Sequence, residues 1–346
     1  MTCPPDNPLQ DLARAWGDTP ARGRLRVAPE DFQVSEIPLL EPEGDGEHIW
    51  VLVRKRLQNT ADVAGLLARC AGVPQRDVSY AGLKDRQAVT EQWFSVHLPG
   101  RTLPDWSAIG SPDVSVLQQA RHGRKLRRGA LRGNRFRIKV RDLVTDPVQL
   151  QYRLETIAAE GVPNYFGEQR FGRNGSNLRI AERLFSNPRM RLSRHQRGLA
   201  LSAARSLLFN AVLSRRVSEG SWNRALPGDA MQLQGSHSYF IATLVDAELQ
   251  QRVAAHDVHP TGPLHGRGAA AVEAGVLALE TAVLAGYPGW RAGLEAAGLK
   301  QERRALRLIP EDLGWTQPEA NVLCMEFSLP AGAYATSVLR ELLSAG

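Results

Sequence analysis

The sequence predicts an α+β protein of two domains with a largely antiparallel sheet. Its 346 residues exceed what one ordinary core needs and fit two domains of the usual size. The two-residue periodicity of strands dominates up to about residue 160, helical spacing dominates the middle of the chain, and strand-like alternation then returns. We therefore expect a sheet domain formed by both ends of the chain, with a second domain inserted into it.

The first hundred residues contain strand patterns and one helix. Residues 23–37 alternate as a strand that is interrupted at Pro29, and residues 48–56, HIWVLVRKR, are rich in β-formers. Apolar side chains then recur at helical spacing over residues 61–73. Residues 91–100, EQWFSVHLPG, predict a further strand that ends at its Pro and Gly.

The basic segment of residues 121–141 contains a strand, and a helix follows it. Phe136, Ile138 and Val140 alternate with cationic residues, so one face can enter a core while the other presents a row of cations. Pro147 stands at the start of a helix whose apolar stripe extends to Gly161.

From about residue 161 the pattern changes to loops and helices. Ser193 begins a long helix, and residues 269–286 and 289–298 predict two shorter ones. Between them, residues 226–243 suggest a small strand element. Strand-like alternation returns at 303–315 and 320–330, and the last helix is expected from residue 335.

The net charge of +7 originates in one stretch of the sequence. Residues 121–141, RHGRKLRRGALRGNRFRIKVR, hold ten Lys or Arg and no Asp or Glu, so the rest of the chain has a formal charge of −3. A phosphate backbone is the expected partner, because clustered cations gain from the counterions that phosphates release. A solubilising face is the alternative, although such faces usually mix both signs.

The composition indicates a globular protein without a membrane span. Hydrophobic residues make up 43% and charged residues 23%, and no run of about 18 apolar residues occurs. The N-terminus lacks the basic start and apolar core of a secretory signal. Three separated cysteines, Cys3, Cys70 and Cys324, form no CxxC pair. We therefore expect a reducing, cytoplasmic location.

A loose group of histidines, His256, His259 and His265, is the candidate metal site of this sequence. The Pro and Gly residues between them predict a loop, without the i, i+4 helical spacing of a zinc-binding helix. We therefore expect no metal.

Asp85 is the residue around which a catalytic hypothesis can be built. The chain lacks the patterns of phosphate loops, dinucleotide-binding folds, zinc peptidases and hydrolase elbows. In YAGLKDRQAVTEQWFSV, residues 80–96, Asp85 lies between Lys84 and Arg86. These cations favour the ionised carboxylate and hence a nucleophile. Lys-Asp-Arg is also common turn chemistry, and the residues alone favour the turn.

Motifs over nearly the whole chain change that balance. The stretch AGLKDRQAVTEQ at 81–92 resembles the signature of the pseudouridine synthase D family (TruD), bacterial enzymes that isomerise uridine 13 of certain transfer RNAs. The further matches are APEDFQVSE at 28–36, LRGNRF at 131–136, VPNYFGEQRFG at 162–172, LPGDAMQL at 226–233, HPTGPLHG at 259–266 and LPAGAYATSVLRELL at 329–343.

The resemblance implies a fold and its boundaries. It implies a pseudouridine synthase catalytic domain with a mainly antiparallel mixed sheet, formed by residues 1–160 and 308–346. It also implies an inserted α/β (TRUD) domain at residues 161–307.

The resemblance also implies site residues. Asp85 matches the catalytic aspartate, which forms a covalent adduct with the target nucleotide. Phe32 matches an active-site aromatic, and Asn134 and Phe136 match a pair that contacts the substrate. An aromatic platform can stack on a base that has left its helix. The competing interpretation of Phe136 is a core residue, because it is in phase with Ile138.

Two matched positions differ among members of the family. Arg26 falls where some members have Lys, and Tyr334 falls where the family often has Phe, so its hydroxyl is a departure. The expected phosphate contacts are the cations Arg124, Lys125, Arg127 and Arg128. Tyr165, Phe166 and Phe171 can pack the junction between the domains or contact RNA, and both alternatives stay open.

Together, the residues and the resemblance predict a transfer RNA pseudouridine synthase. It is expected to act without metal or other cofactor, as a cytoplasmic monomer with no protein partner, and to bind transfer RNA in a basic cleft. The rival hypothesis is a non-catalytic RNA-binding or RNA-folding factor. That factor would explain the cationic stretch but not Asp85 within a matched catalytic motif.

Overall fold

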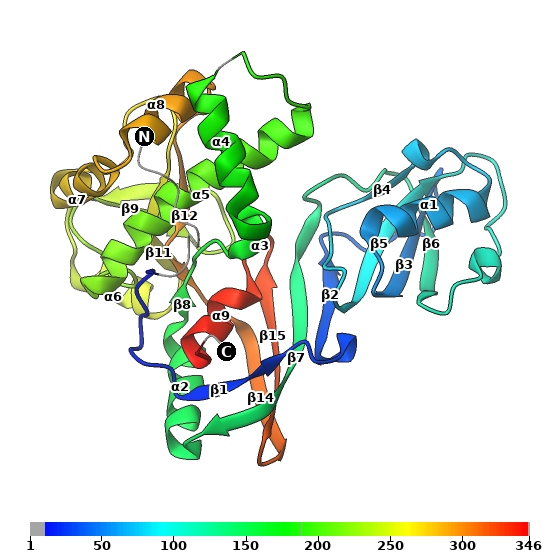
Figure 1. Cartoon of the computed structure of the whole chain (residues 1–346), viewed down its shortest axis with the longest axis horizontal. Coiled ribbons are helices and arrows are strands. Elements are labelled where there is room, and N and C mark those ends of the chain that lie inside the picture. Colours follow the sequence, from blue (N-terminus) through cyan, green and yellow to red (C-terminus); the bar gives the residue numbers. More distant parts are fainter. Residues whose placement is uncertain (1–10, 188, 345–346) are drawn as a thin grey trace. The chain divides into compact units, whose positions relative to one another are not determined.

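The chain forms two compact units in a computed structural model that describes residues 11–187 and 189–344 (Figure 1). Unit 1 comprises residues 11–19, Gln151–Ile309 and Ala333–Leu342. Unit 2 comprises Pro20–Leu150, Pro310–Gly332 and residues 343–344. The boundary between them falls within one helix, α2 (Pro147–Glu160).

Unit 2 is built on a nine-stranded sheet with the order β14-β15-β7-β2-β5-β3-β6, in which β1 pairs with β7 and β4 with β5. Among the strand pairs of residues 11–187 and 189–344, β2 with β5 is the one parallel pair of this sheet, so the expected mainly antiparallel mixed sheet is confirmed. The strands are β1 (Ala21–Leu25), β2 (Phe32–Pro38), β3 (His48–Arg56), β4 (Val78–Tyr80), β5 (Val89–His97), β6 (Val114–His122), β7 (Leu131–Thr145), β14 (Glu311–Glu319) and β15 (Val322–Pro330).

Helix α1 (Thr60–Ala71) covers one face of this sheet, against β3 and β5 (Figure 1). Its apolar stripe, which includes the fully buried Val63 and Leu67, packs on Val51, Phe94 and their neighbours. The helix ends at Gly72, whose φ of 63° is the left-handed conformation that glycine adopts without strain. The predicted amphipathic helix and its flanking strands are therefore confirmed.

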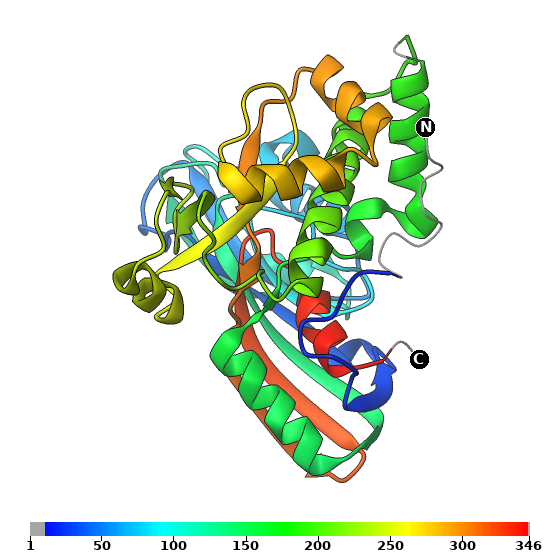
Figure 2. The same cartoon turned by 90° about the vertical axis from the view of Figure 1, so that its left-hand side faces the viewer.

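The hairpin of β14 and β15 lies along β7, as Figure 2 shows for the orange-red and green strands. Strand pairing puts Phe327 of β15 opposite Phe136 of β7, which in turn lies opposite Val34 of β2. Side chains opposite one another on neighbouring strands point to the same face. This face, which also carries α1, is called the α1 face below.

Unit 1 is an α/β assembly around a four-stranded sheet of order β10-β9-β11-β12. The predicted long helix is confirmed as α5 (Arg194–Ser218), which Ser193 begins with a capping box to Gln196. The other helices are α3 (Glu168–Phe171), α4 (Ser176–Ser186), α6 (Ala247–Ala254), α7 (Ala274–Leu284), α8 (Pro288–Ala296) and α9 (Ala335–Leu342). The strands are β8 (Val162–Pro163), β9 (Asp229–Leu233), β10 (Tyr239–Ala242), β11 (Val258–Leu264), β12 (Glu302–Ala305) and β13 (Arg307–Leu308).

The loop expected around His259 is wrong, because this residue lies on the buried strand β11. Val258–Pro260 pair with β9 and the following residues pair with β12, so the two halves of β11 use different neighbours. Its prolines have no N–H for the ladder, and pairing each half on one side accommodates them. The proline and glycine content of the segment therefore predicts a loop where the structure has a strand.

Candidate active site

The Asp85 loop, residues 81–88, joins β4 to β5 on the α1 face of unit 2. A chain of hydrogen bonds fixes it. The side-chain amide of Gln92 donates to the carbonyl of Gly82 at 2.7 Å, the Thr60 hydroxyl donates to Gln92 at 3.0 Å, and the Lys84 N–H donates to Thr60 at 3.0 Å. Gln92 and Thr60 are buried, so these bonds are shielded from water.

The two carboxylate oxygens of Asp85 have different neighbours. Oδ1 accepts a hydrogen bond from the N–H of Gln87 at 3.1 Å, which is an Asp turn of the ordinary kind. Oδ2 lies 2.7 Å from Nη2 of Arg26 in an ion pair. The side chain of Asp85 is 21% exposed, so the carboxylate reaches the surface. The turn interpretation is thus correct for Oδ1, whereas Oδ2 contacts a cation.

Arg26 follows β1 in a left-handed conformation with φ of 57°, which is costly for a residue with a Cβ. Its guanidinium carbon lies 4.2 Å from the ring centroid of Phe32, within cation–π distance. One guanidinium therefore contacts both the aromatic ring and Asp85. The structure brings these three matched residues together.

Phe136 continues the aromatic row from Phe32. The ring centroids of Phe32 and Phe136 are 6.2 Å apart, and Phe136 stacks on Phe327 at 5.6 Å. Phe136 is 7% exposed, so the competing interpretation of a core residue fits the geometry. Asn134 lies two residues earlier on the same face, and its buried Oδ1 accepts no hydrogen bond from any described residue.

A buried ion pair joins the Asp85 loop to β2. Nζ of Lys84 lies 2.7 Å from Oε2 of Glu36, and the two side chains are 6% and 1% exposed. Glu36 in turn lies opposite Asn134 in the strand pairing. Lys84 therefore positions the loop from inside the unit, whereas Arg86 is exposed and donates to the carbonyl of Leu57 at 3.4 Å.

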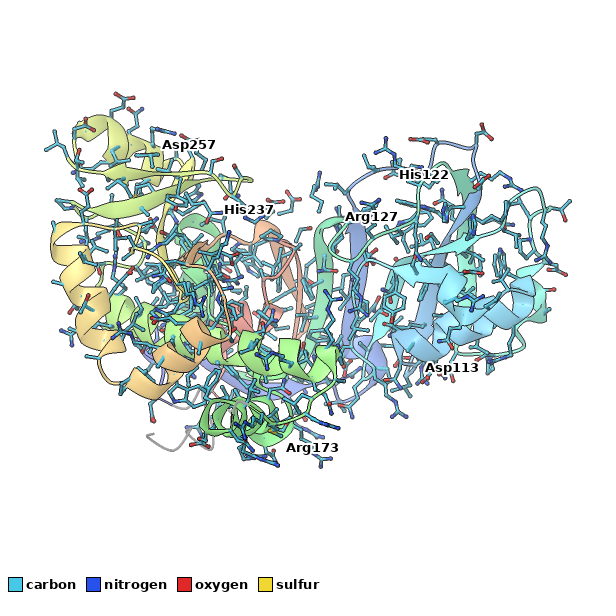
Figure 3. All side chains as sticks on the ribbon, turned by 90° about the horizontal axis from the view of Figure 1, so that it is seen from above. Asp113, His122, Arg127, Arg173, His237 and Asp257 are labelled. Atoms are coloured by element: carbon cyan, nitrogen blue, oxygen red, sulfur yellow. The ribbon has the colours of Figure 1, made fainter. Side chains whose placement is uncertain are left out.

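The loop between β6 and β7, residues 123–130, is called the cationic loop below. Figure 3 labels Arg127 in it and His122 just before it. The buried Leu126 anchors the loop, and the N–H of Gly129 donates to the carbonyl of Ala81 at 2.7 Å. This bond connects the cationic loop to the first residue of the Asp85 loop. Its exposed cations are the expected phosphate contacts Arg124, Lys125, Arg127 and Arg128.

The remaining cations of residues 121–141 have other surroundings. On β7, Arg135 and Arg137 pair with Glu326 of β15, and Arg141 pairs with the buried Asp31. These side chains point away from the α1 face, because they alternate with Phe136. The stretch therefore does not form a single cationic surface, and its cationic loop holds four exposed cations without an ion-pair partner among the described residues.

Comparisons with known proteins show the family of the chain. The family model "tRNA pseudouridine synthase D (TruD)" matches residues 13–188 and 176–342. The chain belongs to this family. A tRNA pseudouridine synthase D of Methylococcus capsulatus is 52% identical over 99% of this chain and 97% of its own length. One of Nitrosococcus oceani is 51% identical over 98% of this chain and 95% of its own length.

A solved structure has the same fold. The crystal structure of the putative tRNA pseudouridine synthase D from Methanosarcina mazei superposes with a TM-score of 0.73. It covers 100% of this chain and 99% of the other, at 24% identity. The TruD fold thus persists at low identity, and the sequence-based recognition of the family is confirmed.

Tyr334, the remaining matched residue, belongs to unit 1. Its hydroxyl accepts a hydrogen bond from Nε of Arg170 at 2.9 Å, and Arg170 also donates to the Ser202 hydroxyl at 2.8 Å. The ring lies edge-on to Phe166 at 6.1 Å. The hydroxyl of Tyr334 therefore ties two motifs of unit 1 together. Tyr165, Phe166 and Phe171 are buried in the core of this unit.

Residues 169–205 form a second cationic region that was not among the predicted phosphate contacts; it is called the arginine-rich segment below. It holds nine arginines, no lysine and one carboxylate, Glu182. Figure 3 labels Arg173 near its start. Among the described residues, its exposed arginines have no carboxylate within 4.0 Å; they are Arg173, Arg179, Arg183, Arg189, Arg191 and Arg194. A count of charges in every window would have found this segment.

The histidines have partners within unit 1. Nε2 of His259 donates to Oε1 of Gln234 at 2.8 Å and Nδ1 accepts from Nε of Arg307 at 3.0 Å, and burial together with Arg307 lowers the pKa of His259 to about 3. His265 contacts Glu295 at 2.9 Å. Over residues 11–187 and 189–344, no three metal-binding side chains lie close enough to hold an ion. No helix in that part of the chain is both long and apolar enough to cross a membrane.

Proposed function

We propose that the protein isomerises uridine 13 of transfer RNA to pseudouridine, with Asp85 as the covalent nucleophile. The observation that carries the proposal is the ion pair of Asp85 with Arg26, beside Phe32 and at the surface of unit 2. The names of the relatives from M. capsulatus and N. oceani support transfer RNA as the substrate.

The reaction needs no redox partner, because substrate and product are isomers. The bond from C1′ to N1 of the uracil breaks, the base rotates, and a bond from C1′ to C5 replaces it. The hydrogen of C5 leaves as a proton and N1 gains one, so atoms and electrons balance. In this proposal the Asp85 carboxylate bonds to the nucleotide and is released again when the C5 bond is complete.

The residues around Asp85 suit a base that has left its stack. Extrusion of a nucleotide costs a few kcal/mol, and stacking on an aromatic ring returns about 1 to 3 kcal/mol. Phe32 and Phe136 supply rings, and the unpaired Oδ1 of Asn134 can accept from the imide N–H of uracil. A cytosine has no such donor at this position.

The domain bounds, the oligomeric state and the location are part of the same proposal. We propose that residues 1–160 and 308–346 form the catalytic domain and that residues 161–307 form the inserted domain. We also propose that the protein acts as a monomer in the cytoplasm. The cationic loop and the arginine-rich segment are the proposed phosphate contacts, because their exposed guanidinium groups match phosphate geometry.

The test uses unmodified transfer RNA transcripts. Wild-type protein is expected to form one pseudouridine, at position 13, and none in a transcript with cytidine at that position. Mapping of modified positions and gel-shift affinity are measured on the same samples. Binding of both transcripts without any pseudouridine would favour the rival RNA-binding factor.

A further inference from the structure

The chain uses lysine sparingly, yet two lysines lie at the Asp85 loop. Its 43 cations comprise 38 arginines and five lysines. Lys84 is one of the two and pairs with Glu36. The other, Lys55 on β3, has 0% exposure and lies on the α1 face opposite Thr90. Arginine is therefore the usual cation of this protein, and the two lysines at the Asp85 loop are exceptions that local contacts can explain.

The ammonium of Lys55 contacts main-chain carbonyls of two loops. Its Nζ donates to the carbonyl of Gln58 at 2.8 Å and to the carbonyl of Asp85 at 3.0 Å. Among the described residues, no carboxylate oxygen lies within 4.0 Å of this nitrogen. Lys55 thus binds the backbone of the proposed nucleophile, whereas Arg26 pairs with its carboxylate.

A buried cation without a close carboxylate is unfavourable for stability. Taking an ammonium out of water costs several kcal/mol, and two carbonyl dipoles compensate only in part. An apolar side chain of similar length would avoid this cost. Perturbed cations of this kind concentrate at functional sites, which is a physical reason to look for a role in the reaction.

We propose that Lys55 is a positioning residue of the reaction: its buried ammonium fixes the main chain of Asp85 and stabilises negative charge on the neighbouring carboxylate. This inference rests on the proposed function. A compact ammonium suits the position, because it can direct separate N–H groups at two carbonyls, whereas the planar guanidinium of arginine cannot adopt this geometry without more space.

The charge of Lys55 is expected to be lost in mildly alkaline solution. Burial lowers its pKa from the ordinary 10.5 to about 8; the Asp85 carboxylate opposes this shift and Lys84 adds to it. Lys84 in turn pairs with Glu36 of β2. Activity should therefore fall as the pH rises through about 8, while RNA contacts made by arginines keep their charge.

The free energy of unfolding should rise with pH where activity falls. Between pH 8 and 10.5 the unfolded chain holds a proton on Lys55 that the folded protein has lost. The free energy of unfolding contributed by this group therefore rises with pH over that window. Loss of activity with rising stability separates a role in the reaction from a purely structural one.

The first measurement is a titration of lysine side chains by NMR. Labelling of lysine with ¹³C gives five Cε signals, which is tractable for this chain. One signal should titrate near pH 8 and be missing in Lys55→Met, whereas it should remain in Lys300→Met, which alters an exposed lysine of unit 1. If all five lysines titrate above about 10, the inference is overturned.

The second measurement compares turnover of Lys55→Met with that of wild type and Lys300→Met. We expect kcat to fall about tenfold or more in Lys55→Met, with KM within about twofold and Tm at pH 7 no lower than that of wild type. The fall in activity of the wild type near pH 8, the alkaline limb of its pH profile, should be absent from Lys55→Met. Unchanged kcat, or a lower Tm with the limb retained, would contradict the role in the reaction.

The proposed function and this inference can fail separately. If wild type forms no pseudouridine, both fail, because Lys55 then has no reaction to support. If wild type is active and Lys55→Met equals it, only the inference fails. If Lys55→Met does not fold, the pH dependence of the wild-type single-turnover rate is the test. A rate that does not change between pH 7 and 9 overturns the inference. A rate that falls at the pH of the NMR titration supports it.

Discussion

The two carboxylate oxygens of Asp85 have different partners. Oδ1 closes a turn with Gln87, and Oδ2 contacts Arg26. The turn sets the direction of the carboxylate, and the guanidinium holds the second oxygen at the surface. Orientation of this kind reduces the entropy lost when a substrate reaches the nucleophile.

Arg26 is expected to contribute to turnover through its charge. In Arg26→Gln the cation beside Asp85 is lost, and kcat should fall by about ten- to a hundredfold, or about 1.4 to 2.7 kcal/mol. Arg26→Lys should retain more activity, because it keeps a cation but not the planar fork over Phe32. Steady-state kinetics on a transfer RNA transcript provide the measurement.

Arg24→Gln is the matched control for this prediction. Arg24 lies on β1, two residues earlier, and forms an exposed ion pair with Asp142. Such surface pairs contribute little, so its variant should match wild type. Equal kcat for Arg26→Gln and Arg24→Gln would show that Arg26 does not contribute to turnover.

Three elements position the Asp85 loop from inside unit 2. The start of α1 contributes Thr60, β5 contributes Gln92, and β2 contributes Glu36. The loop is therefore coupled to the sheet rather than free to move as an isolated turn. This coupling has a measurable energetic consequence.

Lys84→Met should destabilise the protein by about 3 to 5 kcal/mol, because it leaves Glu36 buried without its partner. The double variant Lys84→Met with Glu36→Leu should recover much of this loss, since two apolar side chains replace the pair. Urea unfolding of wild type, both single variants and the double variant gives the coupling energy. Strictly additive losses would show that the pair is not coupled.

The arginine-rich segment of unit 1 is expected to bind phosphates. Arg179 and Arg183 are exposed and one helical turn apart on α4. Changing both to Gln should weaken transfer RNA binding and reduce the slope of log affinity against log salt by about 0.9 for each lost phosphate contact. Fluorescence anisotropy at several salt concentrations measures both quantities.

The control for these arginines changes two paired ones in the same unit. Arg215 pairs with Glu219 and Arg252 with Asp257, so Arg215→Gln with Arg252→Gln removes the same charge. If the segment makes specific contacts, only the first double variant lowers the slope. Equal effects would mean that net charge, not the segment, governs binding.

At the scale of the whole molecule, much of the fold could be predicted from local pattern. The alternation in HIWVLVRKR corresponds to β3, and the helical spacing that follows corresponds to α1. Strand β11 could not be predicted, because its prolines are tolerated only through the split pairing with β9 and β12. That arrangement is a tertiary property, which no window of residues contains.

Part of the candidate site could be predicted from the sequence, but the connections between its residues could not. The motif resemblance named Asp85, Arg26 and Phe32, which the structure brings together. The pair of Lys84 with Glu36 and the contact of Lys55 with the Asp85 backbone join residues far apart in sequence. They depend on strand register and loop closure, which the local sequence around Lys84 does not contain.

The most direct test of the account is the Asp85→Asn variant. Asparagine can keep the turn bond to Gln87 and has the size of aspartate, but it lacks the nucleophilic carboxylate. Pseudouridine formation and transfer RNA affinity are measured separately on the same preparation. If Asp85 is the nucleophile, modification is lost in this variant while transfer RNA affinity stays within about twofold of wild type. Continued formation of pseudouridine by this variant would contradict that role.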